Sequence, residues 1–167
     1  MNMKIKKIFY FGLIRIVGKF NPAFATKISY RFYSSSGMLF KGIPNYISSS
    51  VYFDGGNYSM IELGDGVTIS SEVSFLTHDW ALNTVIKSMN ISYDGILGRH
   101  KKIVVGRNSF IGRGSIILPG ANIGEGVIIG AGSVIRGNIP DFSLVIGNPA
   151  QIIGDTRTYV SKFINRL

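Results

Sequence analysis

The chain has no cysteine, and it has only two histidines and one tryptophan among its 167 residues. Without thiols it cannot form a disulfide framework, a cysteine-ligated zinc or iron–sulfur site, or a cysteine nucleophile, and this composition fits a reducing cytoplasm. His78 and His100 alone are also too few for a three-histidine zinc site, which argues against a metal hydratase. We therefore expect no metal cofactor.

Acidic residues are absent from the first third of the sequence. Residues 1–53 carry eight Lys or Arg and no acid, whereas residues 54–167 carry ten Lys or Arg against nine acids. A basic end on an otherwise balanced chain argues against a broad nucleic-acid surface and favours attraction to anionic lipid, with a solvated helix face as the alternative. We expect a cytoplasmic protein that could contact the inner face of the membrane through residues 1–20.

The sequence has no long hydrophobic run. The apolar run from Ile8 to Ile14 is too short to span a membrane, and Arg15 and Lys19 do not fit a secretory signal. Helical spacing instead predicts an amphipathic helix that packs on the protein or lies on a bilayer. Its apolar stripe comprises Ile5, Ile8, Phe9, Gly12, Leu13, Ile16, Val17 and Phe20.

A six-residue repeat starts at Leu63. Its first position is aliphatic or phenylalanine throughout: Leu63, Ile69, Phe75, Val105, Ile111, Ile117, Ile123, Ile129 and Ile135. From residue 105 its fourth position is always a residue that tolerates a positive φ: Asn108, Gly114, Gly120, Gly126, Gly132 and Asn138. A small or aliphatic residue follows each of these corners. The pattern predicts an all-β solenoid of short parallel strands joined at corners, with three hexads in each coil.

Residues 81–102 interrupt the repeat. The interruption inserts either 12 or 24 residues, and the sequence leaves open which face of the solenoid follows it. We expect three regions: a basic helix and connecting loops over 1–55, the solenoid over 56–154, and a C-terminal helix over 155–167. Asp155 is the predicted N-cap of that helix. The two terminal regions are expected to cap the ends of the solenoid.

Residues 104–154 resemble the C-terminal signature of the hexapeptide-repeat acyltransferases. The most specific matches are "LPGANIG", "IGAGSV", "IP" and "GNPA", and the resemblance covers residues 61–154. It is to the branch that contains galactoside and maltose O-acetyltransferases, xenobiotic acetyltransferases and O-acetyltransferases of capsule or lipopolysaccharide. It implies a left-handed parallel β-helix that assembles as a homotrimer, with acyl-CoA bound between neighbouring subunits.

His78, in "THDW", is the candidate catalytic base. It stands at the corner position of its hexad, where a side chain would point away from the core, and the resemblance implies a general-base histidine just before the interrupting loop. Histidine also exchanges protons near neutral pH, as removal of a hydroxyl proton requires. Asp79 or a backbone carbonyl would orient the ring. We interpret His100 as a simple loop residue.

The resemblance also implies positions along a groove for acetyl-CoA. Phe110 would form an aromatic wall beside the pantetheine arm, next to Gly112. The backbone N–H of Arg113 would stabilise the oxyanion, and Ala131 and Pro149 would continue the wall. Arg136, displaced by one residue from the usual cation, would meet the CoA phosphates. Two further residues are candidates for contact with the acceptor, Asn57 and Trp80.

The sequence therefore predicts an acetyl-CoA-dependent O-acetyltransferase that acts on a sugar hydroxyl of a cell-envelope polysaccharide or its precursor. Two alternatives remain open. One is an N-acetyltransferase of an amino sugar, or a drug acetyltransferase, with the same fold. The other is a non-catalytic solenoid that serves only in assembly.

Overall fold

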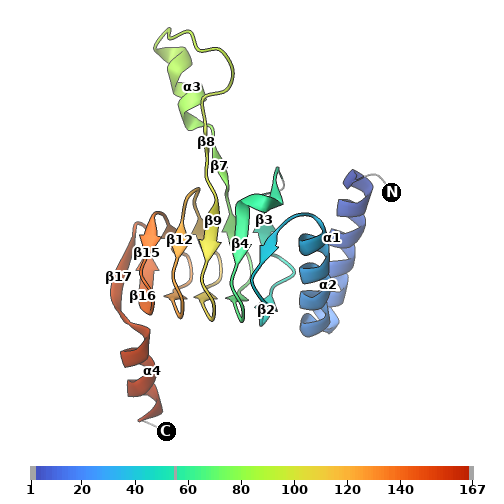
Figure 1. The fold of residues 1–167 in the computed structure, drawn as a ribbon, viewed down its shortest axis with the longest axis vertical. Coiled ribbons are helices and arrows are strands. Elements are labelled where there is room, and N and C mark those ends of the chain that lie inside the picture. Colours follow the sequence, from blue (N-terminus) through green and yellow to red (C-terminus); the bar gives the residue numbers. More distant parts are fainter. Residues whose placement is uncertain (1–2, 55, 166–167) are drawn as a thin grey trace.

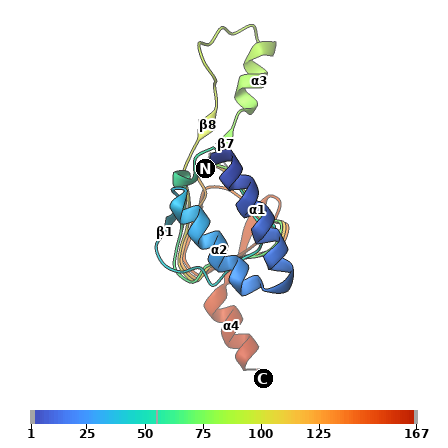
Figure 2. The same cartoon turned by 90° about the vertical axis from the view of Figure 1, so that its right-hand side faces the viewer.

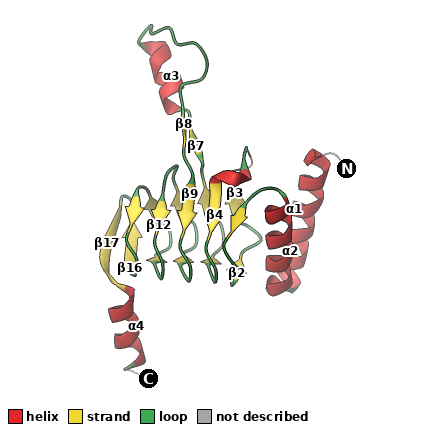
Figure 3. Cartoon of the chain, in the orientation of Figure 1, coloured by secondary structure: helices red, strands yellow, loops and turns green. Residues whose placement is uncertain are grey.

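Three sheets of mostly parallel strands form the body of the protein in the computed structural model, which describes residues 3–54 and 56–165 (Figures 1 and 3). Sheet A contains β1 (Leu39–Phe40), β4 (Ile61–Leu63), β9 (Ile103–Val105), β12 (Asn122–Ile123) and β15 (Asn138–Ile139). Sheet B contains β2 (Tyr46–Ile47), β5 (Thr68–Ile69), β10 (Phe110–Ile111), β13 (Ile128–Ile129), β16 (Ser143–Gly147) and β17 (Ala150–Asp155). Sheet C contains β3 (Tyr52–Phe53), β6 (Ser74–Phe75), β11 (Ile116–Ile117) and β14 (Val134–Ile135). The chain visits A, B and C in turn, so successive coils stack.

The core is the ladder that the repeat predicts. Every first-position residue of the hexads from Leu63 to Ile135 has at most 1% of its surface exposed. Ladder partners stack in register: Ile111 pairs with Ile69 on one side and with Ile129 on the other. Glycine or asparagine takes a positive φ at the corners from Asn108 to Gly132. Burial of this aliphatic ladder along the stack holds the coils together.

The first coil begins earlier than the sequence predicts. Strands β1, β2 and β3 pair with β4, β5 and β6, so residues 39–53 belong to the coiled body and are not loops outside it. The boundary expected at residue 56 is therefore wrong by one coil. The inward residues Phe40, Ile47 and Phe53 are unevenly spaced, which hides this coil from a search for hexads.

The last hexad is shorter than the others. Ile139 pairs with Ile123, only 16 positions earlier, whereas an uninterrupted coil has 18 residues. The corner lies at Gly137, with a φ of 68°, and Asn138 is in strand β15 instead of at the expected corner. The prediction of a corner at Asn138 was wrong because two residues are missing from this turn.

The interruption is an arm that leaves the body between sheets C and A. It consists of β7 (His78–Asp79), α3 (Ala81–Ser88), a loop and β8 (Arg99–His100), with β7 and β8 paired antiparallel. Val105 pairs with Leu63, 42 positions earlier, so the arm inserts 24 residues beyond the normal coil of 18 and sheet A follows it. Figures 1 and 2 show the arm extending away from the coils.

Two N-terminal helices, α1 (Met3–Phe20) and α2 (Pro22–Ser35), cover the first coil (Figure 2). The side chain of Asn21 caps α2, and the Thr26 hydroxyl hydrogen-bonds to backbone atoms of Ile47 in β2. Phe32 and Tyr33 join the core of the body. The predicted apolar stripe of α1 is largely exposed. Ile14 is buried, but Ile5, Ile8, Phe9, Ile16 and Phe20 are exposed. Within the described residues, no helix is both long and apolar enough to cross a membrane.

At the other end, α4 (Thr156–Ile164) starts at the predicted cap. The Asp155 carboxylate accepts hydrogen bonds from the backbone N–H groups of Arg157 and Thr158 at 2.9 and 3.3 Å. The helix projects from the body, however, and only Thr156 is buried in it (Figure 1). The expectation that α4 caps the coils was therefore wrong. Strand β17 covers this end instead, by pairing antiparallel with β16.

Candidate active site

His78 lies where the arm leaves the last strand of its coil. Strand β3 pairs with β6, and the Asp54 backbone N–H donates to the Phe75 carbonyl at 3.0 Å. Asp54 follows β3 just as Thr77 and His78 follow β6, so the pairing of the strands brings these three residues together from two neighbouring coils. This position is not a corner with positive φ, because His78 lies in β7 and pairs with His100.

A buried carboxylate holds the His78 ring. Asp54 is 3% exposed, and its Oδ2 accepts hydrogen bonds from the Thr77 backbone N–H at 3.1 Å and from the Thr77 hydroxyl at 2.7 Å. The same oxygen makes a short contact with His78 Nδ1. Burial raises the pKa of the Asp54 carboxyl, but the hydrogen bonds from Thr77 and His78 lower it by more, so this pKa lies below its ordinary value. Asp54 is therefore an anion at neutral pH.

The charge of Asp54 fixes the tautomer of neutral His78. An ionised carboxylate can only accept hydrogen bonds, so Nδ1 must carry the hydrogen and Nε2 must carry the lone pair. No other described residue hydrogen-bonds to Nε2, and 36% of the His78 side chain is exposed. His78 can therefore accept a proton from a molecule outside the chain, as a general base must.

Two further aromatic residues flank His78, and both belong to the arm. The Trp80 ring centroid lies 4.9 Å from that of His78, and the His100 ring stacks on His78 at 5.8 Å. The Trp80 indole N–H donates to His100 Nε2 at 3.3 Å. The interpretation of His100 as a simple loop residue was therefore wrong. The pairing of β7 with β8 places it there, and no local sequence pattern indicates that pairing.

Asp79 does not orient the His78 ring as expected. Its Oδ1 accepts the backbone N–H of Ala81 at 2.8 Å, at the start of α3. Adjacent residues of a strand point to opposite sides, and here Asp54 takes the position against Nδ1. Sequence reasoning missed Asp54 because it lies 24 residues before His78. Only an alignment of Phe53 with Phe75 would have revealed it.

The Asn57 side chain, a predicted contact of the acceptor, hydrogen-bonds within its own segment. Its side-chain oxygen accepts hydrogen bonds from the Ser59 backbone N–H at 3.0 Å and the Ser59 hydroxyl at 2.7 Å, at the start of the short helix η1 (Tyr58–Met60). The structure therefore brings Trp80 to His78 and gives Asn57 a capping contact.

Four of the residues predicted to line the CoA groove, Phe110, Gly112, Arg113 and Ala131, lie on sheet B or at the corner between sheets B and C. Phe110, in β10, points outward and is 41% exposed. Gly112 packs beneath the next coil, where a Cβ atom would approach the Ala131 backbone nitrogen to 2.6 Å. The backbone N–H groups of Arg113 and Ala131 donate to no acceptor among the described residues. These two N–H groups can therefore donate to a ligand from successive coils, at the corner between sheets B and C.

Arg136 and Pro149 are brought together at the far end of the body. They line one cavity of about 200 Å³ with Val134, Ile139 and Ala150. The Gly147 backbone N–H donates to the Ser133 hydroxyl at 3.1 Å, which ties the turn between β16 and β17 to the coil that holds Ala131. The Arg113 side chain is engaged elsewhere, in two hydrogen bonds with Glu72 at 2.8 and 3.2 Å.

Sheet C therefore separates Asp54 and His78 from Arg113 and Ala131, while Arg136 follows the sheet C strand β14. Asp54 and His78 follow the sheet C strands β3 and β6, whereas Arg113 and Ala131 precede the sheet C strands β11 and β14. The strands of sheet C separate the two groups within one chain. Within the described residues, no group of three or more His, Asp or Glu side chains could hold a metal ion.

Comparison with known proteins relates this fold to transferases. A family model described as "Bacterial transferase hexapeptide (six repeats)" matches residues 102–137. A variant of AntD, an N-acyltransferase from Bacillus cereus solved with dTDP and coenzyme A, is 26% identical with a TM-score of 0.55. The match covers 70% of this chain and 63% of that one, so this chain spans less than two thirds of AntD.

Two other solved structures share the fold over more of their length. A hexapeptide-repeat acetyltransferase, VCA0836 from Vibrio cholerae O1 biovar eltor, solved with acetyl-CoA, is 22% identical with a TM-score of 0.63, over 88% of this chain and 85% of that one. A maltose O-acetyltransferase from Clostridium difficile 630 is 22% identical with a TM-score of 0.59, over 90% and 86%. No protein of curated function matches the sequence. The ladder, the corners and these matches identify residues 102–137 as a bacterial transferase hexapeptide repeat, in a chain similar to the hexapeptide-repeat acyltransferases.

Proposed function

We propose that this protein is an acetyl-CoA-dependent O-acetyltransferase that acts on a sugar hydroxyl of a cell-envelope polysaccharide or its precursor. The observation that carries the proposal is the contact between buried Asp54 and His78 Nδ1, which leaves Nε2 free to accept a proton. The matched hexapeptide repeat supports it, as do the transferases of similar fold that were solved with CoA or acetyl-CoA. A non-catalytic solenoid would have no use for an oriented, accessible base.

In the proposed reaction the acceptor hydroxyl donates its proton to His78 Nε2 while its oxygen attacks the thioester carbonyl carbon. The carbonyl oxygen becomes an oxyanion, which the Arg113 backbone N–H stabilises. When the tetrahedral intermediate collapses, the carbon–sulfur bond breaks and the CoA sulfur takes the proton from His78. The products are the acetyl ester and free CoA. Asp54 stays ionised throughout and stabilises the imidazolium.

This reaction requires the two residue groups to meet, and we propose that they meet between subunits of a homotrimer of left-handed β-helices. Donor bound along the corner of Arg113 and Ala131 in one copy would then face His78 of the next copy. Exposed apolar side chains on the arm support such an association: Leu82, Val85, Met89, Ile91, Tyr93 and Ile96. Light scattering at micromolar concentration should give a trimer mass, and a monomer mass would contradict the assembly.

An N-acetyltransferase of an amino sugar is the second candidate. It is favoured by the similarity to AntD, an N-acyltransferase. The same His78 would take a proton from the amine during its attack. A matched pair of acceptors that differ only in a hydroxyl or an amino group at one carbon would distinguish the two reactions by which product acquires the acetyl group.

CoA binding tests the donor half of the proposal. Arg136→Gln should weaken CoA binding by about tenfold in calorimetry, because one charge-assisted contact to a phosphate is lost. Binding of pantetheine, which lacks the nucleotide phosphates, should not change. Lys162→Gln removes one exposed charge from α4 and is the matched control. Failure of the wild-type protein to bind CoA would refute the transferase assignment.

We also propose peripheral contact with the cytoplasmic face of the membrane through α1. The outward residues Ile8 and Phe20 are 74% and 85% exposed beside the basic residue Lys19, which suits an interfacial helix. Such contact would bring the enzyme close to a lipid-linked acceptor.

A further inference from the structure

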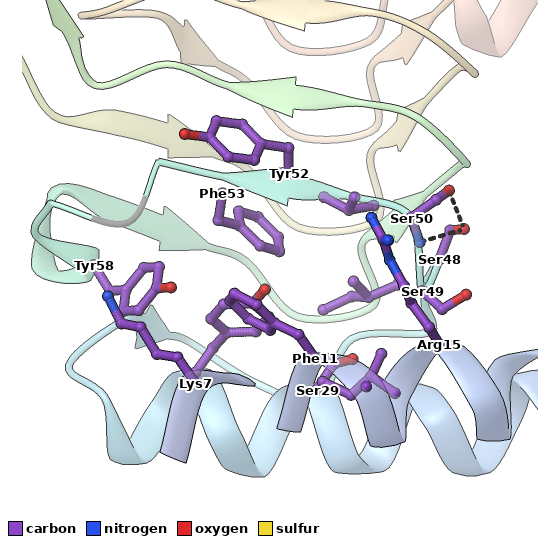
Figure 4. A pocket seen from close by; sticks show the side chains of 15 residues that line it. Lys7, Phe11, Arg15, Ser29, Ser48, Ser49, Ser50, Tyr52, Phe53 and Tyr58 are labelled. Atoms are coloured by element: carbon purple, nitrogen blue, oxygen red, sulfur yellow. Dashed lines mark hydrogen bonds between the residues drawn. The ribbon is translucent and has the colours of Figure 1, made fainter. Parts of the chain in front are cut away.

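A cavity of about 550 Å³ lies between α1 and the first coil (Figure 4). Its wall is mainly aliphatic and aromatic, and it includes Phe11, Ile14, Tyr33, Val51, Phe53 and Tyr58. This volume falls within the range of small-molecule sites, roughly 300–1,000 Å³. Neither His78 nor any residue predicted to bind CoA lines it.

One residue that lines this cavity carries an unsatisfied polar atom. Ser29, on α2, is only 1% exposed and lines the cavity, yet its hydroxyl oxygen has no hydrogen-bond partner among the described residues. Buried hydroxyls are normally paired, because an unpaired one loses its hydrogen bonds to water without compensation. The Ser29 hydroxyl is therefore an unpaired polar group buried in the wall of the cavity.

One end of the cavity suits an anion. Arg15 lies beside Ser48, Ser49 and Ser50 (Figure 4), and within the described residues its guanidinium has no hydrogen-bond or ion-pair partner. Gly18 lets α1 approach this end, because a Cβ atom there would lie 2.6 Å from the Ser49 hydroxyl oxygen. The Ser48 and Ser50 hydroxyls hydrogen-bond to each other at 3.2 Å, which leaves one hydrogen of this pair and the Ser49 hydroxyl to donate beside the guanidinium. A guanidinium beside such donors matches the chemistry of a phosphate or carboxylate group.

The other end of the cavity is closed by aromatic rings. The Lys7 ammonium lies over the Tyr58 ring, 4.9 Å from its centroid (Figure 4). Burial raises the pKa of Tyr33 above its ordinary range, and burial also raises the pKa of Tyr58. Both phenols therefore stay uncharged at neutral pH, so the wall facing the middle of the cavity can take an apolar chain.

From this arrangement we propose that the cavity binds a single-chain anionic amphiphile: an alkyl or acyl chain that ends in a phosphate or carboxylate. The head group contacts Arg15 and the three serines, and the chain extends past Ser29 among the aromatic residues. Arg15 and Lys7 are eight residues apart on α1, about 12 Å along the helix axis, which leaves room for the chain between the two ends. The proposal does not depend on acetyl transfer.

Calorimetry with octyl phosphate below its micelle concentration tests the site. Octyl phosphate should bind at 1:1 stoichiometry per chain. It should bind more tightly than octanol, which lacks the anionic head group, and more tightly than inorganic phosphate, which lacks the alkyl chain. Octanoate, measured in parallel, shows whether the site prefers the carboxylate of a fatty acid or the phosphate of an alkyl phosphate. If octyl phosphate does not bind, or binds no better than octanol, the site is refuted.

A pair of variants on α1 locates the head group. Arg15→Gln should weaken octyl phosphate binding by about 10- to 100-fold, as expected for loss of a charged hydrogen-bond donor. Lys19→Gln removes the same charge from an exposed position outside the cavity and should leave the affinity unchanged. Equal losses in the two variants would assign the binding to the general charge of α1 and overturn the proposal.

Filling the cavity tests the position of the chain. Ser29→Leu replaces the unpaired hydroxyl with a larger apolar side chain and should abolish binding of octyl phosphate in a folded protein, as checked by circular dichroism. If that variant does not fold, a photoactivatable octyl phosphate analogue should crosslink at Phe11 or Ile14 of α1, or within residues 47–53, of the wild-type chain. Crosslinks confined to the exposed stripe of α1 would show an interfacial helix instead of a cavity site. CoA affinity, measured on the same samples, reports on the transferase separately.

Discussion

Replacing His78 with asparagine is expected to lower kcat by about 100- to 10,000-fold, the usual contribution of a positioned general base. An asparagine amide can still donate a hydrogen bond to buried Asp54, so the carboxylate keeps a partner and the fold should persist. CoA affinity should change little, because the proposed contacts with the donor are made by Arg113, Ala131 and Arg136, and His78 acts on the acceptor hydroxyl. Release of free thiol from acetyl-CoA in the presence of a sugar acceptor measures the rate.

His100→Asn is the matched control for this change. It removes the other histidine, which stacks on His78 but makes no contact with Asp54, so its effect should stay below about tenfold. A folded His78→Asn protein that binds CoA and keeps full activity would place the base elsewhere. A larger loss in His100→Asn than in His78→Asn would exchange the roles of the two rings.

The regular part of the fold could be predicted because the residues of each hexad determine its strand and its corner locally. An aliphatic first position, as in Ile117, and a glycine or asparagine corner, as in Gly114, occur together in every unit from residue 105 to 132, and the structure confirms them. The irregular parts failed for local reasons. The first coil lacks the even spacing of the others, and the last one is shortened at Gly137.

In the candidate site, His78 could be predicted from the sequence, but its partners could not. His78 is conspicuous because histidine is so rare in this chain, but its partners are set by long-range strand pairing. Asp54 reaches His78 through the pairing of β3 with β6, and His100 reaches it through the pairing of β7 with β8. Asp54 and His100 lie 24 and 22 positions from His78, so no pattern in the sequence around "THDW" indicates them. Asp79, next in sequence, was the natural candidate but is used at the start of α3.

Asp54→Asn should lower kcat by about 1,000- to 10,000-fold, although the side chain keeps its shape. Both hydrogen bonds from Thr77 and the contact with His78 Nδ1 converge on Oδ2. An asparagine oxygen in that place keeps these partners but loses the charge that stabilises the imidazolium, whereas an amide nitrogen there gives up the bonds from Thr77 and donates to His78 Nδ1. In the second case the ring hydrogen would move to Nε2, where the lone pair is needed. In Ser-His-Asp enzymes the equivalent change costs about 10⁴-fold in kcat through the same wrong tautomer.

The same variant should change how stability depends on pH. Because the pKa of Asp54 is lowered in the folded protein, its ionised form contributes stability above the unfolded pKa, and this is lost as the pH falls through the folded value. Urea midpoints should therefore show wild type more stable than Asp54→Asn at pH 7. The difference should shrink below about pH 4, near the ordinary pKa of aspartate.

Asp79→Asn decides between the two aspartates as the partner of His78. Asparagine can accept the Ala81 backbone N–H as well as aspartate does, so this neighbouring change should leave both kcat and the pH dependence of stability near those of wild type. Loss of the charge of Asp54 alone should then reproduce most of the defect of His78→Asn, because a base in the wrong tautomer is nearly as ineffective as none. If Asp79→Asn is inactive while Asp54→Asn retains activity, the ring is oriented by its sequence neighbour during turnover, and the Asp54 contact serves only the fold.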